Sequence, residues 1–458
     1  MNTCLISTYE MGRQPFGLAS PAALLRSSGH AVACFDLAVA PLDEYAVAAA
    51  DLIAFYVPMH TATRIAVSLV QRIRGLNPRA HICFYGLYAP LNEAYLRRVG
   101  VGTILGGEYE EGLLALVKRL SRGPGGRVQV EPVISLARQQ FRTPDRSGLP
   151  DLADYARLII GPGDERIVGY TEATRGCKHL CRHCPIVPVY QGRFRIVQQG
   201  AVLDDIAQQV EAGASHITFG DPDFFNAPRH SIALVDELHQ RFPDVTYDVT
   251  IKVEHLLKHA DYVGVLRDTG CLFVTSAVES FDDRILEIFD KGHTRQETLR
   301  VLALFRDVGL ILVPTFVAFT PWTTLGGYCD FLSDVLTFEL VGNVAPVQYA
   351  IRLLIPAGSK LLELDATQQV ISDFDEEALC YPWAHPDSRM DRLQAEMMTV
   401  VKDAQRKNKT RERVFARIWE TAQSAYGDNA KERREMLRSS SDAPARVTIP
   451  YMTEPWFC

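Results

Sequence analysis

The segment TEATRGCKHLCRHCP, residues 171–185, contains Cys177, Cys181 and Cys184, which are separated by three and two residues. Iron–sulfur clusters are held by cysteine thiolates, and a 4Fe–4S cube has one iron more than three local cysteines can ligate. The spacing therefore predicts a cluster with one iron open to a small molecule. The segment follows an apolar run, at the strand end where an α/β barrel carries its reactive residues.

Two other interpretations of the three cysteines stay open. A zinc knuckle would take His179 or His183 as the fourth tetrahedral ligand, although no second CxxC or HxxxH pair follows within ~12–20 residues. A structural cluster would instead take a fourth cysteine far along the chain. Either interpretation makes the protein a non-catalytic zinc or iron–sulfur sensor.

On both sides of the cysteines the chain alternates strand and helix patterns. Residues 1–120 predict a parallel sheet with helices on both faces, in a Rossmann-like or flavodoxin-like domain. Residues 121–165, with SRGPGGR and GPGDE, favour a linker. Residues 166–365 predict a partial (β/α)6 TIM barrel, and residues 366–458 a helical extension with a cysteine-containing tail. The expected strands are Cys4–Thr8, His30–Phe35, Ala50–Val57, His81–Tyr85, Gly102–Leu105, Ile167–Ala173, His216–Gly220, Tyr247–Lys252, Leu272–Ala277, Leu312–Phe319 and Val347–Leu354.

The bulk composition is that of a soluble globular protein. Of 458 residues, 47% are hydrophobic and 22% charged, and the net charge of −7 argues against nucleic acid as a partner. The start of the chain resembles no signal peptide, and no apolar run reaches the ~18 residues of a membrane span, so we expect a cytoplasmic protein. Three of the ten cysteines cluster, which favours metal binding over disulfides.

The cysteine segment resembles the radical S-adenosylmethionine (SAM) superfamily. Residues 1–360 resemble its cobalamin-binding-domain class. The resemblance implies a 4Fe–4S cluster whose open iron takes the amino and carboxylate groups of SAM. It also implies an external electron donor such as flavodoxin or ferredoxin, and homolytic cleavage of one carbon–sulfur bond of SAM, giving either 5′-deoxyadenosyl-radical chemistry or transfer of the 3-amino-3-carboxypropyl group.

Further residues at predicted strand ends match SAM-contacting positions of that superfamily. In GDPDFF the acidic turn would receive the SAM amino group, and in SAVESF a serine and a glutamate would bond the ribose and nearby polar atoms. Basic side chains would balance the SAM carboxylate or anchor the cysteine loop. The alternatives are an Asp–Pro turn, a buried serine, a helix-capping glutamate and solvated cations. The candidates are Gly220, Asp221, Asp223, Lys252, Ser276, Glu279, Arg195 and Arg352.

Cobalamin is a doubtful cofactor on sequence grounds. Gly106-Gly107-Glu108 resembles the closing turn of the cobalamin-binding class. In base-off cobalamin enzymes, however, an Asp-x-His-x-x-Gly loop after the first strand supplies the lower cobalt ligand, and here the loop reads STYEMGRQPFG. Either cobalamin binds without a histidine or the domain only shapes the pocket.

The ending TEPWFC resembles a radical SAM group with a carboxyl-terminal Cys-Cys-Ala-Glu-Pro or Cys-selenocysteine-Ala-Glu-Pro tail. Cys458 matches the first residue of that tail, which leads to the hypothesis that the native chain continues with cysteine or selenocysteine. Relatives similar to this group are linked to arsinothricin formation, so the resemblance implies arsenite as a small-molecule substrate. Thiolates prefer such soft metalloids, and Cys329, Cys380 and Cys458 are the candidate substrate thiols. The alternative is that unpaired cysteines are small buried hydrophobic residues.

Overall fold

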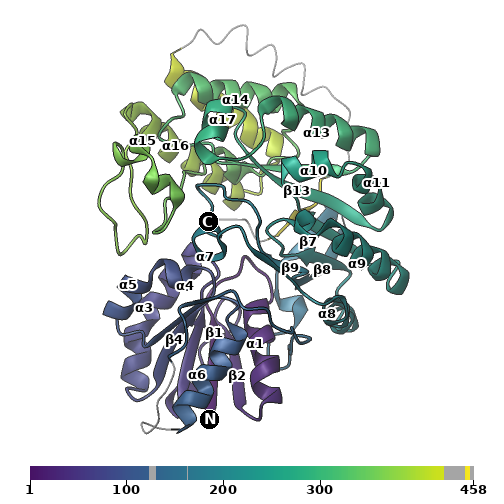
Figure 1. The fold of residues 1–458 in the computed structure, drawn as a ribbon. Helices are drawn as coiled ribbons and strands as arrows, with labels where there is room; N and C mark the ends of the chain where they lie inside the picture. Colours follow the sequence, from purple (N-terminus) through teal and green to yellow (C-terminus); the bar gives the residue numbers. More distant parts are fainter. Residues whose placement is uncertain (123–129, 162, 428–448, 454–458) are drawn as a thin grey trace.

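The computed structural model describes residues 1–122, 130–161, 163–427 and 449–453. An N-terminal α/β domain lies against a second, larger α/β domain, and helices from the last part of the chain cover the larger domain (Figure 1). The predicted fold class is confirmed. In the described ranges no helix combines the length and apolar character needed to cross a membrane.

The N-terminal domain is a parallel sheet with the strand order β2-β1-β3-β4-β5-β6. The order of its first five strands is that of flavodoxin-like folds, whose ligand crevice lies where the order reverses, here between β1 and β3. Strands β3 and β5 are buried along their whole length, because helices cover both faces. The elements are β1 (Asn2–Ser7), α1 (Phe16–Ser27), β2 (Ala31–Asp36), α2 (Glu44–Ala49), β3 (Leu52–Tyr56), α3 (His60–Leu76), β4 (His81–Tyr85), α4 (Tyr88–Leu91), α5 (Glu93–Arg98), β5 (Thr103–Gly107), α6 (Glu110–Arg122) and β6 (Ile134–Ser135).

The described part of the predicted linker contributes one strand to each sheet. Strand β6 extends the N-terminal sheet beside β5. Strand β7 (Arg157–Gly161) pairs antiparallel with the first barrel strand, β8 (Asp164–Thr171). The segment between them therefore joins the two domains through backbone hydrogen bonds at both of its ends.

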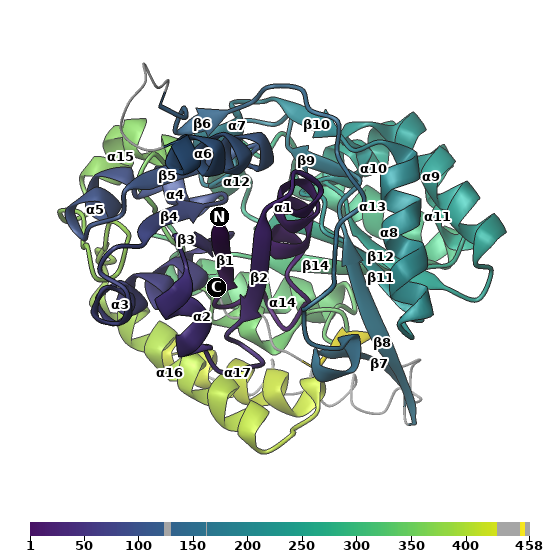
Figure 2. The same cartoon turned by 90° about the horizontal axis from the view of Figure 1, so that it is seen from below.

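The second domain is a seven-stranded sheet with the order β14-β13-β12-β11-β8-β7-β15. Strands β8, β11, β12, β13 and β14 are parallel neighbours, and the connecting helices lie on the outer side (Figures 1 and 2). This is an open barrel with its reactive edge at the carboxyl ends of the strands. The remaining elements are β9 (Thr174–Gly176), α7 (Val187–Tyr190), β10 (Phe194–Ile196), α8 (Gln199–Glu211), β11 (His216–Phe219), α9 (Pro228–Arg241), β12 (Thr246–Thr250), α10 (Val253–Lys258), α11 (Asp261–Asp268), β13 (Cys271–Glu279), α12 (Asp283–Phe289), α13 (Arg295–Val308), β14 (Ile311–Phe316) and α14 (Leu325–Thr337).

The expected sixth barrel strand, Val347–Leu354, is wrong as a strand. Residues Pro346–Tyr349 form a 3-10 turn, and only one parallel bridge, Phe319 to Arg352, continues the sheet. Proline has no N–H to donate to a ladder, and Pro346 starts the turn while Pro356 follows closely. The run is apolar because it is buried, not because it is extended.

The predicted C-terminal helices are confirmed within the described ranges. Helices α16 (Ser388–Arg406) and α17 (Arg411–Tyr426) lie side by side along one edge of the molecule (Figure 2). Their apolar faces join the barrel core through residues such as Met397, Ile418 and Trp419, all at most 2% exposed. Strand β15 (Tyr451–Met452) pairs antiparallel with β7. The short elements between barrel and extension are Lys360–Glu363 and α15 (Asp365–Gln368).

Candidate functional site

The cysteine loop lies between the two strands of a short hairpin at the carboxyl end of β8. Strands β9 and β10 pair antiparallel, so residues 177–193 leave and return at one place. The middle of the loop is fixed by the barrel: the Arg182 N–H donates to the Phe289 carbonyl at 2.8 Å, and the Arg182 carbonyl accepts from the Ser359 hydroxyl at 3.0 Å. The loop is thus held at its base and at its tip.

The three thiols of this loop are unbridged, and the thiols of Cys181 and Cys184 interact electrostatically with that of Cys177. The Cys184 N–H donates to the Cys181 carbonyl at 3.2 Å. Burial raises the pKa of the Cys177 thiol to about 12 and that of Cys184 to about 11. Metal binding requires thiolates, so an incoming metal displaces these protons. Clustered, mostly buried thiols are a donor set that fits an iron–sulfur cluster.

His179 keeps the zinc interpretation open. The Cys177 sulfur, a His179 ring nitrogen and an Asp223 carboxylate oxygen lie within 4.8 Å of one another. These are donors that zinc accepts.

The two aspartates of the GDPDFF turn have different surroundings. Asp221 accepts from the Thr174 hydroxyl at 2.6 Å and from the Ala173 N–H at 2.9 Å, so both of its oxygens are engaged. Asp223 uses one oxygen to cap Phe225 N–H, while its Oδ2 is buried and has no hydrogen-bond partner among the described residues. Asp221 therefore fixes the chain before the cysteines, and Asp223 keeps an acceptor for a ligand.

Burial raises the pKa of Asp221 to about 7, against the lowering effect of its hydrogen bonds to Thr174 and Ala173. For Asp223, burial also acts upward, but His179 and His255 outweigh it and lower the pKa. His255 Nδ1 lies 2.6 Å from Asp223 Oδ2 without hydrogen-bond geometry. Asp223 is thus held as a carboxylate beside two imidazoles.

Lys252 lies just after β12, and its ammonium contacts His179, which also lies beside Asp223. Its ammonium is 3.2 Å from His179 Nδ1 and 3.3 Å from a Glu254 oxygen. The His179 and His255 Nε2 atoms are 3.2 Å apart. The structure therefore brings Lys252 and Asp223 together around His179.

Ser276 and Glu279 lie on β13, on the other side of the cysteine loop. The Ser276 hydroxyl is fully buried and lacks a partner in the described ranges. Glu279, at a left-handed φ of 68°, accepts from Lys291 at 3.4 Å and lies 3.3 Å from His183. Burial would raise the pKa of Glu279, but Lys291 and His183 lower it to about 2.

Sequence reasoning missed Lys291 and His255. Lys291 is 4% exposed, and Glu279 with the thiolates of Cys181 and Cys184 raises its pKa against the effect of burial. The only sequence feature that could have indicated Lys291 is its position before a glycine in DKGHT. Nothing in the spacing distinguished it from a solvated cation.

Other predicted residues lie apart from this group. Arg352 pairs with Asp391 at 2.7 Å and stacks on Trp383, so it ties the barrel to the extension. Arg195 bonds the carbonyls of Phe194 and Leu136. Cys329 is buried between α14 and α17, with its sulfur 3.9 Å from the Ala422 carbonyl. Cys380 is half-buried in a turn, where it forms a β-bridge with Asp375. Gly220 packs against Tyr170 and has no room for a side chain. Cys458 lies outside the described residues.

The N-terminal crevice was the expected place for cobalamin. Tyr56 packs directly on Gly17 of α1, where an added Cβ would lie 2.2 Å from the ring. Tyr85 and Tyr109 pack against Tyr56 as tilted rings, with centroids 5.4 and 5.9 Å from that of Tyr56 and 5.0 Å from each other. The loop after β1 offers buried Glu10 in place of a histidine. These side chains fill the crevice themselves, so the residues present do not fit a corrin and its lower ligand.

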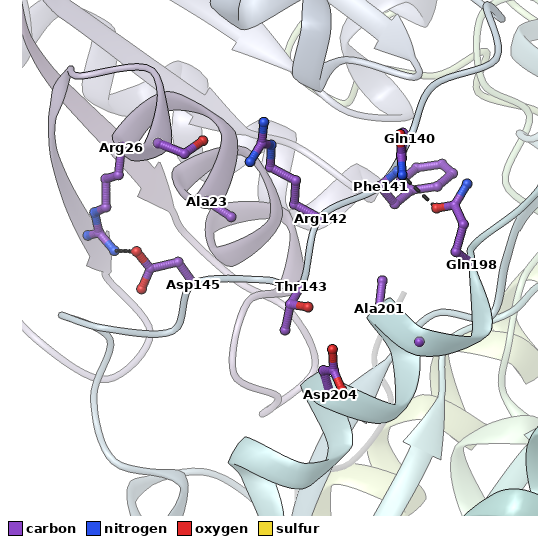
Figure 3. A pocket seen from close by; sticks show the side chains of 12 residues that line it. Ala23, Arg26, Gln140, Phe141, Arg142, Thr143, Asp145, Gln198, Ala201 and Asp204 are labelled. Atoms are coloured by element: carbon purple, nitrogen blue, oxygen red, sulfur yellow. Dashed lines mark hydrogen bonds and ion pairs between the residues drawn. The ribbon is translucent and has the colours of Figure 1, made fainter.

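An open groove of about 620 Å³ lies elsewhere, between α1, the connecting segment and α8 (Figure 3). Arg26 and Asp145 form an ion pair on its wall, and the Phe141 N–H donates to Gln198. None of the predicted site residues lines it. It is a surface groove separate from the cysteine loop.

The thiol loop at the carboxyl end of a barrel strand, beside buried unpaired polar atoms, defines a metal-cluster-binding α/β-barrel enzyme. The family model described as the radical SAM superfamily matches residues 171–323. The match covers the cysteine loop and barrel strands β11 to β14, and radical SAM enzymes work with a 4Fe–4S cluster and SAM.

The relatives agree with this assignment. A tRNA-2-methylthio-N(6)-dimethylallyladenosine synthase of Chlorobium phaeovibrioides is 29% identical over 158 residues, 32% of this chain and 34% of the relative. An uncharacterized methyltransferase of Pyrococcus horikoshii is 23% identical over 230 residues, 47% and 49% of the two chains. The chain thus spans about a third of the length of the synthases it matches.

Two solved structures show the same fold. OxsB, a cobalamin-dependent SAM radical enzyme solved with aqua-cobalamin and SAM, superposes with a TM-score of 0.73 at 14% identity, over 96% of this chain and 75% of that one. TsrM, a radical SAM methyltransferase from Kitasatospora setae, gives 0.57 at 17% identity, over 74% and 72%.

Proposed function

We propose that this protein is a radical SAM enzyme that cleaves SAM reductively and transfers its 3-amino-3-carboxypropyl group to arsenite. The observation that carries the first part is the radical SAM match around three unbridged thiols of one loop, one of them buried and two half-buried. When bound, the cluster supplies the electron that cleaves SAM. The acceptor is proposed from the likeness of the TEPWFC ending to the arsinothricin-linked group.

The chain's own residues would divide the work as follows. Cys177, Cys181 and Cys184 would hold the cluster. The open oxygen of Asp223 would accept the SAM ammonium, and the Ser276 hydroxyl would bond the ribose, because each has a buried group in need of a partner. Lys252 would balance the SAM carboxylate.

The substrate thiols remain a proposal as well. Cys380, in a half-buried turn, and Cys458 would bind arsenite as soft thiolates. Cys329 would need α17 to move before arsenite could reach it. We further propose a flavodoxin or ferredoxin as the electron donor, and the cytoplasm as the location.

Product analysis tests the function. Cluster-loaded protein with dithionite and SAM is expected to give 5′-methylthioadenosine, and an arsenic-bound aminocarboxypropyl product once arsenite is added. Formation of 5′-deoxyadenosine alone would contradict group transfer. If neither 5′-methylthioadenosine nor 5′-deoxyadenosine forms, the radical SAM function itself is contradicted.

Cobalamin-dependent methyl transfer is the second candidate. The names of the relatives, a methyltransferase and methylthio synthases, together with the cobalamin in OxsB, favour it. It predicts methyl transfer only in protein loaded with cobalamin. The filled crevice at Tyr56 and Gly17 favours the first candidate.

A further inference from the structure

The hairpin that frames the cysteine loop is attached to the N-terminal domain on both of its strands. Arg175 on β9 and Arg195 on β10 are opposite each other in the ladder. Arg175 reaches two glutamates after β5, and Arg195 bonds the Leu136 carbonyl directly after β6. Both contacts cross from the barrel to the N-terminal sheet.

Arg175 is surrounded by anionic groups. Its Nη1 donates to Glu110 at 2.6 Å and lies 3.5 Å from Glu108, and its Nε donates to Glu172 at 2.7 Å. The arginine side chain is 5% exposed. Its guanidinium carbon also lies 4.8–5.4 Å from the ring centroids of three aromatic residues. These are Phe16, Tyr109 and Phe141.

The glutamates are themselves fixed in place. Glu110 accepts from Ser20 at 2.7 Å and from Gln139 at 2.8 Å, and Glu108 accepts from the Tyr190 hydroxyl at 3.2 Å. Tyr190 belongs to α7, inside the cysteine loop. Buried charge-assisted hydrogen bonds of this kind are geometrically demanding, and losing one partner leaves an uncompensated charge.

The residue after Arg175 restricts the path of the chain. Gly176 has φ 74°, and a Cβ there would lie 2.3 Å from the Tyr190 ring and 2.6 Å from the Arg193 carbonyl. Cys177 follows at once. A shift of Arg175 therefore passes directly to the first cysteine.

We propose that the N-terminal domain is the scaffold of the cysteine loop, with Arg175 and Arg195 as positioning residues that hold its hairpin. The proposal rests on the proposed cluster at Cys177, Cys181 and Cys184. It gives the domain a task that needs no cobalamin: it fixes the path of the loop that carries the three thiols before the metal arrives.

The test uses three variants of the full chain. Arg175→Lys keeps the charge but removes the planar fork and the stacking. Glu110→Gln removes one anchor at nearly constant volume. Glu131→Gln is the matched control, because the Glu131 side chain is also buried and pairs with Arg119 at 2.7 and 2.9 Å away from the cysteine loop.

Alkylation of the metal-free protein by iodoacetamide, read cysteine by cysteine with mass spectrometry, gives the first readout. In Arg175→Lys and Glu110→Gln we expect the three loop cysteines to react about tenfold faster. Cys83, fully buried in the N-terminal sheet, should not change and serves as the reference for global unfolding. Glu131→Gln should match the wild type throughout.

Iron release from the reconstituted full chain to a ferrous chelator gives the second readout, with faster loss expected in the same two variants. Unchanged loop reactivity in both variants would overturn the proposal, as would an equal effect in Glu131→Gln or at Cys83. A wild type that binds the cluster but never cleaves SAM would refute the proposed function and leave this inference standing.

Discussion

The Arg175 interface and the mouth of the barrel are both buried and polar, but they differ in how their polar groups are paired. At the interface Arg175 and Glu110 have close partners on every side. At the mouth the Ser276 hydroxyl has none among the described residues, and Asp223 Oδ2 has only His255 and His179 beside it, without hydrogen-bond geometry. Buried polar atoms are nearly always satisfied, so the interface is complete as a protein structure, whereas the mouth keeps buried polar groups for the ligand we propose.

The largest test of this difference removes one cluster ligand. Cys181→Ser should abolish SAM cleavage and stable iron binding, while the fold and the interface stay intact, since the change affects the mouth alone. Iron analysis and nucleoside product assays measure it. Cys271→Ser, a buried barrel cysteine away from the loop, should keep both activities; equal loss in that control would contradict the assignment.

A second test disturbs the turn that carries the interface glutamates. Gly107 has φ 69°, and a Cβ would lie 2.3 Å from the Ser135 carbonyl oxygen. Gly107→Ala should therefore lower the free energy of unfolding by about 1–3 kcal/mol in urea titrations. Gly75→Ala, in α3 with open space around it, should be neutral or stabilising. Equal effects in both would show that the turn does not require glycine.

A third test compares a partnerless hydroxyl with a paired one. Ser276→Ala should weaken SAM binding about fivefold and leave the stability of the ligand-free protein unchanged or higher. Ser231→Ala, which breaks hydrogen bonds to Phe224 and Ala227, should cost about 1 kcal/mol of stability and spare SAM binding. Equilibrium dialysis and thermal unfolding measure both. The comparison fails if Ser276→Ala binds SAM as the wild type does.

The smallest effect concerns pH at the interface. Burial raises the pKa of Glu108 to about 7, although Arg175 opposes the shift. A carboxyl with a raised folded-state pKa contributes stability below its unfolded value near 4.5 and loses it as the pH rises through 7. Glu108→Gln should therefore flatten the fall in Tm between pH 4.5 and about 7. An unchanged slope would contradict a protonated Glu108.

Strand periodicity made most of the fold predictable. The run His81–Tyr85 is β4 to the residue, and the parallel pairing of the first five N-terminal strands follows from βα alternation. The strand prediction for Val347–Leu354 was wrong because this run is apolar through burial, and Pro346 starts a 3-10 turn there instead of a strand. Strands β6 and β7 lie in the segment that the sequence predicted as a linker. Strand β6 has only two residues and β7 lies near the sheet edge, so neither leaves a clear periodic pattern in the sequence.

The candidate site was predictable where chemistry lies in adjacent residues and not where it depends on contact. The three cysteines stand within eight residues of sequence. Asp221 and Asp223 look alike in the sequence, and only the hydrogen bonds to Thr174 and Ala173 separate their roles. Arg175 and Glu110 are 65 residues apart, a distance at which ion pairs leave no local pattern.

Strand β15 affects how the protein behaves in a crowded solution. Strand β7 would otherwise present unpaired N–H and carbonyl groups at the edge of the barrel sheet, a template for pairing with another chain. Two ladder partners, Tyr451 and Met452, and the Thr453 hydrogen bonds to Arg157 cover it. The C-terminal segment thus protects the sheet from self-association, and purification tags or truncations placed there would favour aggregation.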